Sequence, residues 1–202
     1  RLAGFQKTST EELDQAIIGL QALGMRSMVL DLRGNPGGLL NVAVEIADRF
    51  IDNGVIVSTR GRAPGQTQIM RAGGHARYRM PVYVLVDHDS ASASEILAGA
   101  LQDHRRALVL GERTYGKGSV QSIFSLRSAP AGLKLTTAKF YSPQDRPYSE
   151  QGVSPDLSVK TRIAAKPNAD DHGNTSLDET IAGDPKLDPV LAAALRAAKG
   201  RQ

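Results

Sequence analysis

The strongest constraint on the fold is an alternation of amphipathic helical segments with short apolar runs over the first 110 residues. Apolar residues at helical spacing predict one helix from about Ser9 to Gly24 and a second over residues 39–50. The polar start at Thr8 to Glu12 predicts a capping box at the first helix. Buried strands are predicted at residues 27–32, 55–59, 82–86 and 107–110. This alternation is typical of an α/β layered domain with a mostly parallel sheet.

The remaining segments follow a different order. Residues 60–80 are polar and rich in Gly and Arg, which predicts a loop. A third helix is predicted from the SASASE run to about Asp103. Beyond it the sequence predicts a β-hairpin appendix, residues 119–126 and 133–141, and a final helix over 188–198 with Pro189 in its first turn. The predicted organisation is a core over 1–160, a polar and mobile linker over 161–186 and a C-terminal helix over 187–202.

Composition excludes several classes of function. The chain has no cysteine, which removes a cysteine nucleophile, a thiolate metal site and any disulfide. The net charge is +4, but the basic residues are interspersed with acids, and the Arg-rich stretch 60–79 is typical of a solvated loop, so no nucleic-acid partner is expected. No run approaches the roughly 18 apolar residues of a membrane span. No signal peptide is visible in the opening RLAGFQKTST, and this start looks abrupt.

Candidate functional residues gather in loops that follow three predicted strands: RGNPGG, DHDSASASE and ERTYGKGSVQ. Functional groups in open α/β sheets lie at the carboxyl ends of strands. Ser92 and Glu95 have the spacing of a capping box, which is a purely structural interpretation. A serine that heads a helix is also exposed, and the N–H of Ala93 would face an oxyanion there. As a nucleophile, Ser92 would require a base.

Two sources of such a base can be weighed. The four histidines lie in no recognisable triad motif, and there is no G-x-S-x-G elbow. Lys117 lies between two glycines, and a lysine acts as a base near neutral pH when burial lowers its pKa from about 10.4 to about 7. The alternative for Lys117 is a solvated turn residue. The segment 111–117 also fits the G-x-x-x-x-G-K phosphate-binding loop, although Gly118 replaces the Ser or Thr that holds magnesium.

Four blocks of the sequence resemble the carboxyl-terminal processing peptidases, or tail-specific proteases. The blocks span roughly residues 28–159 and read VLDLRGNPGG, VLVDHDSASASEILAGALQDHRR, VLGERTYGKGSVQ and GVSPDLSV. The resemblance implies a fold related to the crotonase and ClpP spiral α/β architecture. It implies a serine endopeptidase with acyl-enzyme chemistry and no metal or other cofactor.

The resemblance also assigns roles to individual residues. Ser92 would be the nucleophile, Lys117 its general base and Gln121 a residue that orients the lysine. On a regular strand Lys117 and Gln121 would face the same side. The oxyanion would be bound by the N–H of Ala93 and by that of Gly38, with Gly37 as the alternative donor. Asp103 aligns with an acid near the family site, and a helix-end charge is the plainer role.

Some expectations concern partners and location. Family members usually carry a PDZ domain that selects C-terminal tails, and none is visible here, so a missing domain or adaptor is expected to select the polypeptide substrate. The final helix resembles one used in oligomer contacts, and the family works outside the cytoplasm, in a periplasm or cell envelope. Asp145 replaces a common glycine, which puts the turn there in doubt. The alternative function is a non-catalytic peptide- or ligand-binding module on the same fold.

Overall fold

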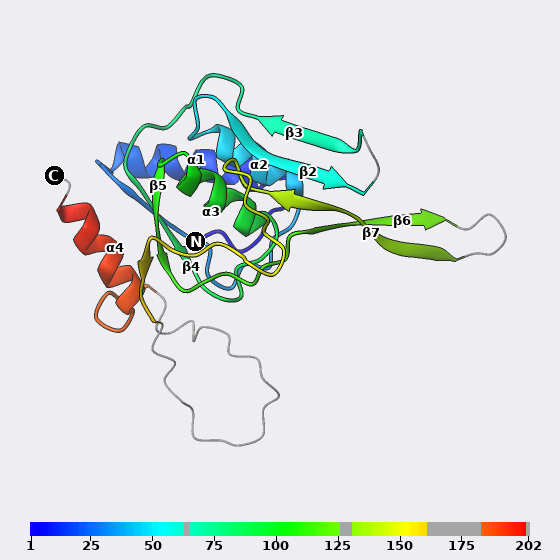
Figure 1. The fold of residues 1–202 in the computed structure, drawn as a ribbon. Helices are drawn as coiled ribbons and strands as arrows, with labels where there is room; N and C mark the ends of the chain where they lie inside the picture. The colour runs from blue at the N-terminus through cyan, green and yellow to red at the C-terminus, as the bar shows by residue number, and fades with distance from the viewer. Residues whose placement is uncertain (63–64, 126–130, 161–182, 201–202) are drawn as a thin grey trace, which may run out of the picture.

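The computed structural model describes residues 1–62, 65–125, 131–160 and 183–200. Figure 1 shows two sheets with helices between them and a two-stranded hairpin that extends from the body. The helices are α1 (Ser9–Ala22), α2 (Leu40–Asp48), α3 (Ala93–Asp103) and α4 (Pro189–Lys199). The strands are β1 (Met28–Asp31), β2 (Val55–Gly61), β3 (Thr67–Arg71), β4 (Val82–Val86), β5 (Ala107–Gly111), β6 (Ser119–Ser125), β7 (Gly132–Tyr141) and β8 (Leu157–Ser158).

The first sheet is parallel, with the strand order β1-β4-β5-β8. All five residues of β4 are buried, as in a strand that is covered on both faces. Alternate side chains point to opposite faces. Val82, Val84 and Val86 therefore join the main core with α2 and α3, whereas Tyr83 and Leu85 pack against α4. The predicted α/β class and parallel sheet are confirmed.

The second sheet is antiparallel, with the order β3-β2-β7-β6. Two of its features differ from the sequence-based prediction. β3 lies within the stretch 60–80, for which the sequence predicts a loop. The prediction is wrong because the side chains of β3 are mostly exposed and give no apolar pattern. The hairpin β6–β7 is more than an appendix, because β7 also pairs with β2 and joins the hairpin to the body (Figure 1).

The predicted start of α4 is confirmed, whereas the capping box predicted at the start of α1 is wrong. Helix α4 begins with Pro189 in its first turn, as predicted, and Asp188 is its N-cap. The capping box predicted for α1 does not form, since Thr8 has helical backbone angles and its side chain makes no cap hydrogen bond. Ser9 instead accepts a hydrogen bond from the N–H of Gln6 and donates one to the carbonyl of Gly4. Most of the predicted linker, residues 161–182, lies outside the described residues.

Candidate active site

The three glycine- and serine-rich loops predicted from the sequence meet at one edge of the parallel sheet. They follow β1, β4 and β5, which are adjacent in the sheet and end at the same side. The loop after β1 contacts the loop after β4 directly, because the N–H of Ala91 donates to the carbonyl of Asn35 at 3.0 Å. The loop after β5 is joined to the same place, since the N–H of Tyr115 donates to the carbonyl of Ser90.

Ser92 occupies a sharp turn at the start of α3. Its backbone angles are φ 58° and ψ −112°, a region that residues other than glycine rarely adopt. Such strain persists only where the surroundings impose it, and it is common at functional sites. Ser92 is half-buried and forms a capping box with Glu95, as the sequence predicts. The turn places the serine at the positive end of the helix dipole.

Glu95 joins the serine to the loop that carries Lys117. One of its carboxylate oxygens accepts from the N–H of Ser92 at 2.8 Å and from that of Lys117 at 2.9 Å. The other oxygen accepts from the Thr114 hydroxyl at 2.5 Å and from the N–H of Gly116 at 2.6 Å. The side chain is fully buried, so these hydrogen bonds form away from solvent. Sequence reasoning assigned Glu95 only to the capping box and missed its contacts with the third loop.

Gly37, the first glycine of the pair in the first loop, lies against the serine. A side-chain carbon at Gly37, where φ is +105°, would lie 2.9 Å from the Cβ of Ser92 and 3.0 Å from the nitrogen of Ala93. The N–H of Gly37 donates to the side chain of Asn35 at 2.8 Å. Among the described residues, the N–H groups of Gly38 and Ala93 have no hydrogen-bond partner. Ala93 directly follows Ser92 in the chain, and Gly38 directly follows Gly37, the glycine that lies against Ser92.

Lys117 differs from the sequence-based expectation in one respect. Its side chain is exposed, and within the described part of the chain it has no hydrogen-bond or ion-pair partner. The burial expected for this side chain is therefore absent from the structure. The glycines beside it are explained by close packing, because a side-chain carbon at Gly118 would lie 2.1 Å from the nitrogen of Ser149.

The parity argument for Gln121 does not hold in the structure. β6 begins at Ser119, two residues after Lys117, and the pairing with β7 shifts register between Val120 and Gln121. Regular alternation therefore does not relate Lys117 to Gln121. Gln121 is exposed and is paired with Thr136 of β7.

The nucleotide-binding alternative conflicts with the geometry of the third loop. A strand, β6, follows this loop where a phosphate-binding loop requires a helix. The N–H groups of Gly116 and Lys117 donate to Glu95, so they are not free to bind a phosphate.

Three other residues have structural roles. His104 lies against β2, with Nε2 2.7 Å from the carbonyl oxygen of Val55. Asp103 accepts hydrogen bonds from the N–H of Gln144 and from Arg146. The turn that contains Asp145 forms with φ 66° at that residue, a conformation that Asp tolerates better than most residues.

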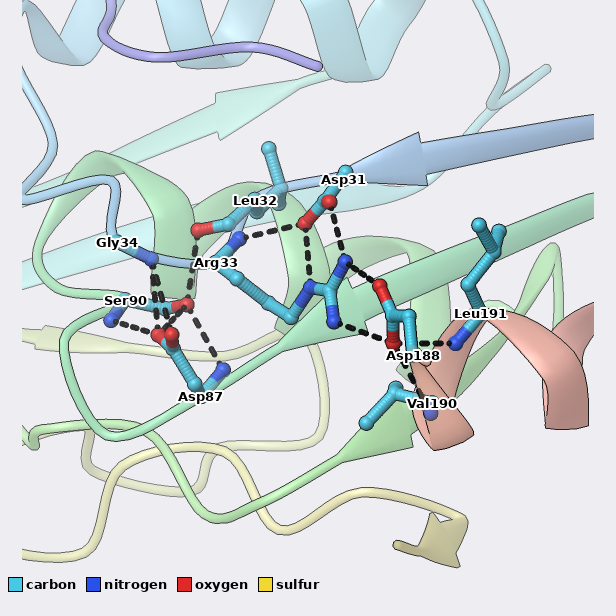
Figure 2. Close-up of polar contacts among 9 residues, drawn as sticks. All are labelled: Asp31, Leu32, Arg33, Gly34, Asp87, Ser90, Asp188, Val190 and Leu191. Carbon is cyan, nitrogen blue, oxygen red and sulfur yellow. Dashed lines mark hydrogen bonds and ion pairs between the residues drawn. The ribbon is translucent and has the colours of Figure 1, made fainter. Parts of the chain in front are cut away.

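A buried polar network holds the loops that follow β1 and β4 (Figure 2). Asp87 accepts hydrogen bonds from the N–H of Gly34 and from the backbone and hydroxyl of Ser90. The guanidinium of Arg33 lies between Asp31 and Asp188. Sequence reasoning missed Arg33, because a single Arg beside a glycine-rich turn is usually a solvated residue.

No group of three or more His, Asp or Glu side chains in the described part of the chain could hold a metal ion. None of the helices within those residues has the length and hydropathy of a membrane span.

Known proteins match this chain over most of its length. The model of peptidase family S41 matches residues 1–159. A carboxy-terminal-processing protease of Bartonella bacilliformis is 43% identical over 173 residues, which cover 82% of this chain and 39% of that protein. A carboxyl-terminal-processing protease of Synechocystis is 43% identical over 160 residues, 79% of this chain and 37% of that protein. The solved photosystem II D1 C-terminal processing protease is 38% identical with a TM-score of 0.74, over 81% of this chain and 42% of that structure. The chain thus spans less than half the length of these proteins.

Proposed function

Because the chain belongs to peptidase family S41, we propose that it is the catalytic core of a serine endopeptidase with Ser92 as nucleophile and Lys117 as general base. The observation that carries the proposal is the contact of one buried carboxylate, that of Glu95, with the backbones of both residues. A residue that served only to cap α3 would not need to bind the loop that carries Lys117. The strained turn at Ser92 is a second supporting observation.

The proposed chemistry is acyl transfer. The Oγ of Ser92 attacks the carbonyl carbon of a peptide bond while the neutral amine of Lys117 accepts the hydroxyl proton. The C–N bond then breaks, and the protonated Lys117 gives its proton to the leaving amine. Water next attacks the serine ester and gives a proton to Lys117. The C–O bond breaks and Ser92 regains its hydrogen.

Two backbone N–H groups would stabilise the tetrahedral anion. Gly38 and Ala93 are the candidates, since neither N–H has a partner in the described part of the chain. Gly37 is the less suitable alternative because Asn35 already accepts its N–H. The start of α3 adds the positive end of its dipole near Ala93.

Burial of Lys117 would come with the substrate. A polypeptide lying over the turn at Gly116 and Lys117 would remove water from the amine and favour its neutral form. Gln121 would orient the amine of Lys117 once the bound polypeptide also covers β6. An exposed base in the free protein fits a peptidase whose activity rises when substrate closes the site.

The proposed substrate is an extended or unfolded polypeptide. An extended or unfolded polypeptide can add to a sheet edge through its backbone, with little preference for sequence. Selection of C-terminal tails would require a PDZ domain or an adaptor beyond these residues. Bacterial and chloroplastic processing proteases are among the relatives. We propose an extracytoplasmic location on that basis.

The experiment is cleavage of casein together with labelling by a fluorophosphonate, a reagent that reacts with activated serines. We expect wild-type protein to be labelled at Ser92, and both activities to be lost in Ser92→Ala and Lys117→Ala. His88→Ala is the control, because this exposed residue makes only a 3.4 Å contact with Asp89. Labelling that persists in Lys117→Ala would refute the dyad.

The alternative function is a binding module on the same fold. It predicts that unfolded polypeptides bind equally well to the wild type and to Lys117→Ala, with no acyl-enzyme in either. Mass spectrometry of the protein after mixing with casein distinguishes the two, since only the enzyme forms a covalent ester on Ser92.

A further inference from the structure

We propose that Asp188 is a positioning residue for the active-site loop, so that seating of α4 on the sheet is coupled to the alignment of the glycines beside Ser92. The inference rests on the proposed function. Asp188 and α4 lie beyond residues 1–159, the part that the peptidase family matches. The coupling passes through the buried guanidinium of Arg33 (Figure 2).

Asp188 and Arg33 form a two-pronged ion pair away from solvent. The Nη1 and Nη2 atoms of Arg33 donate to the two carboxylate oxygens of Asp188 at 2.9 and 2.7 Å. The exposed fractions of the two side chains are only 1% and 2%. Asp31 binds the opposite side of the guanidinium at 2.9 and 2.7 Å. A buried guanidinium cannot lose its charge, so each carboxylate is needed to offset its desolvation.

Asp188 also begins α4. Its Oδ1 accepts from the N–H groups of Val190 and Leu191 at 3.1 and 3.0 Å. The helix then covers Tyr83 and Leu85 of β4 with Val190 and Ala194. One carboxylate thus caps the helix and holds Arg33, and the helix cannot leave the sheet without removing a partner from the buried charge.

Arg33 is the first residue of the loop that faces Ser92. Its own N–H is fixed by Asp31 at 3.0 Å, and the next N–H, that of Gly34, is fixed by Asp87. Asn35 then binds the N–H of Gly37 and, through its carbonyl, Ala91. A shift of Arg33 would therefore be transmitted over a few residues to Gly37 and Gly38.

The substitution Asp188→Asn separates the two roles of this residue. Asparagine is as good an N-cap as aspartate, so its oxygen can still serve α4 and the Nη1 of Arg33. Its amide NH₂ then faces the Nη2 of Arg33, which places a donor against a donor. The matched control is Val190→Ala, which weakens the packing of α4 but leaves both backbone hydrogen bonds to Asp188 intact.

The experiment measures hydrogen exchange of the 34–38 amides and the rate of fluorophosphonate labelling in both variants. We expect both variants to lower Tm by about 5 °C. Asp188→Asn should raise exchange across 34–38 and slow the labelling of Ser92 at least tenfold, whereas Val190→Ala should change both less than twofold.

The possible outcomes are distinguishable. Unchanged exchange in Asp188→Asn would overturn the coupling, whatever the labelling shows. Equal effects of the two variants would also overturn it, because Asp188 would then act only through the stability of α4. Increased exchange in Asp188→Asn, with a wild type that is not labelled at Ser92, would support the coupling and refute the proposed function.

Discussion

The substitution Glu95→Gln tests the link between Ser92, the proposed nucleophile, and Lys117, the proposed base. Each oxygen of the buried Glu95 carboxylate accepts two hydrogen bonds. Glutamine keeps one of these oxygens as an acceptor and has an NH₂ group in place of the other. Either the Ser92 and Lys117 pair or the Thr114 and Gly116 pair of donors then faces an NH₂ group. Hydrogen bonds to a charged group contribute about 1.5–3 kcal/mol each, so the variant should lose about 3–6 kcal/mol of folding free energy.

That loss is a large fraction of the roughly 5–15 kcal/mol that stabilises a domain. We expect urea midpoints to fall accordingly, and the labelling of Ser92 at low temperature to drop at least a hundredfold in protein that remains folded. Thr114→Val is a milder form of the same test, because it removes one donor from Glu95 and leaves the carboxylate.

The control is Asp103→Asn on the same helix. The Asp103 carboxylate is also buried, with an exposed fraction of 1%, but its hydrogen bonds reach the turn near Gln144 rather than the lysine loop. Asp103→Asn should lower the free energy of unfolding with little effect on the labelling of Ser92. If folded Glu95→Gln is labelled at the wild-type rate, the reasoning about the carboxylate link is wrong.

Three further predictions follow from single residues. Gly37→Ala places a methyl group 2.9 Å from the Cβ of Ser92 at a φ of +105°, so labelling should fall at least tenfold, and an unchanged rate would contradict the close approach. Burial raises the pKa of Tyr78 to about 12, so its stabilisation is full below pH 10 and is lost as the pH rises toward 12. The urea midpoint should fall between pH 10 and pH 12 in the wild type and should fall less in Tyr78→Phe. An equal fall in the two proteins would contradict the stabilisation by Tyr78. Burial alone would raise the pKa of Asp188, but hydrogen bonds led by that from Arg33 hold the pKa below its ordinary value, so the contribution of Asp188 to stability is present above about pH 4 and is lost in acid. The Tm difference between the wild type and Asp188→Asn should therefore narrow below pH 4, and a constant difference would argue against the ion pair.

Local patterns predicted most of the elements around the site. Helix α3 and the buried strand β4 were predicted correctly because their apolar periodicity and the SASASE start are encoded within a few residues. The strand β3 was missed since its residues are mostly polar and exposed, and its partner β2 is what makes it a strand. Propensity is a weak guide where pairing supplies the stabilisation.

The site itself was predictable only in part. The loop that carries Ser92 could be placed at a strand end from sequence, but the second set of partners of Glu95 comes from a loop about twenty residues later. No periodicity reports such contacts. The shift of register in β6 likewise has no local signal, and it removed the basis for relating Lys117 to Gln121 by alternation.

The pairing of Arg33 with Asp188 has a consequence for the order of events during synthesis. The two residues are 155 positions apart, so the glycine-rich loop emerges from the ribosome long before its second carboxylate. At rates of about 5–20 residues per second, that interval lasts from several seconds to about half a minute. During this time the sheet and α3 can form while Arg33 is paired with Asp31 and Asp188 has not yet been synthesised. Under the proposed function, the nascent protein would acquire its folded scaffold first and an aligned Ser92 last, so cleavage of neighbouring unfolded chains would begin only after α4 is seated.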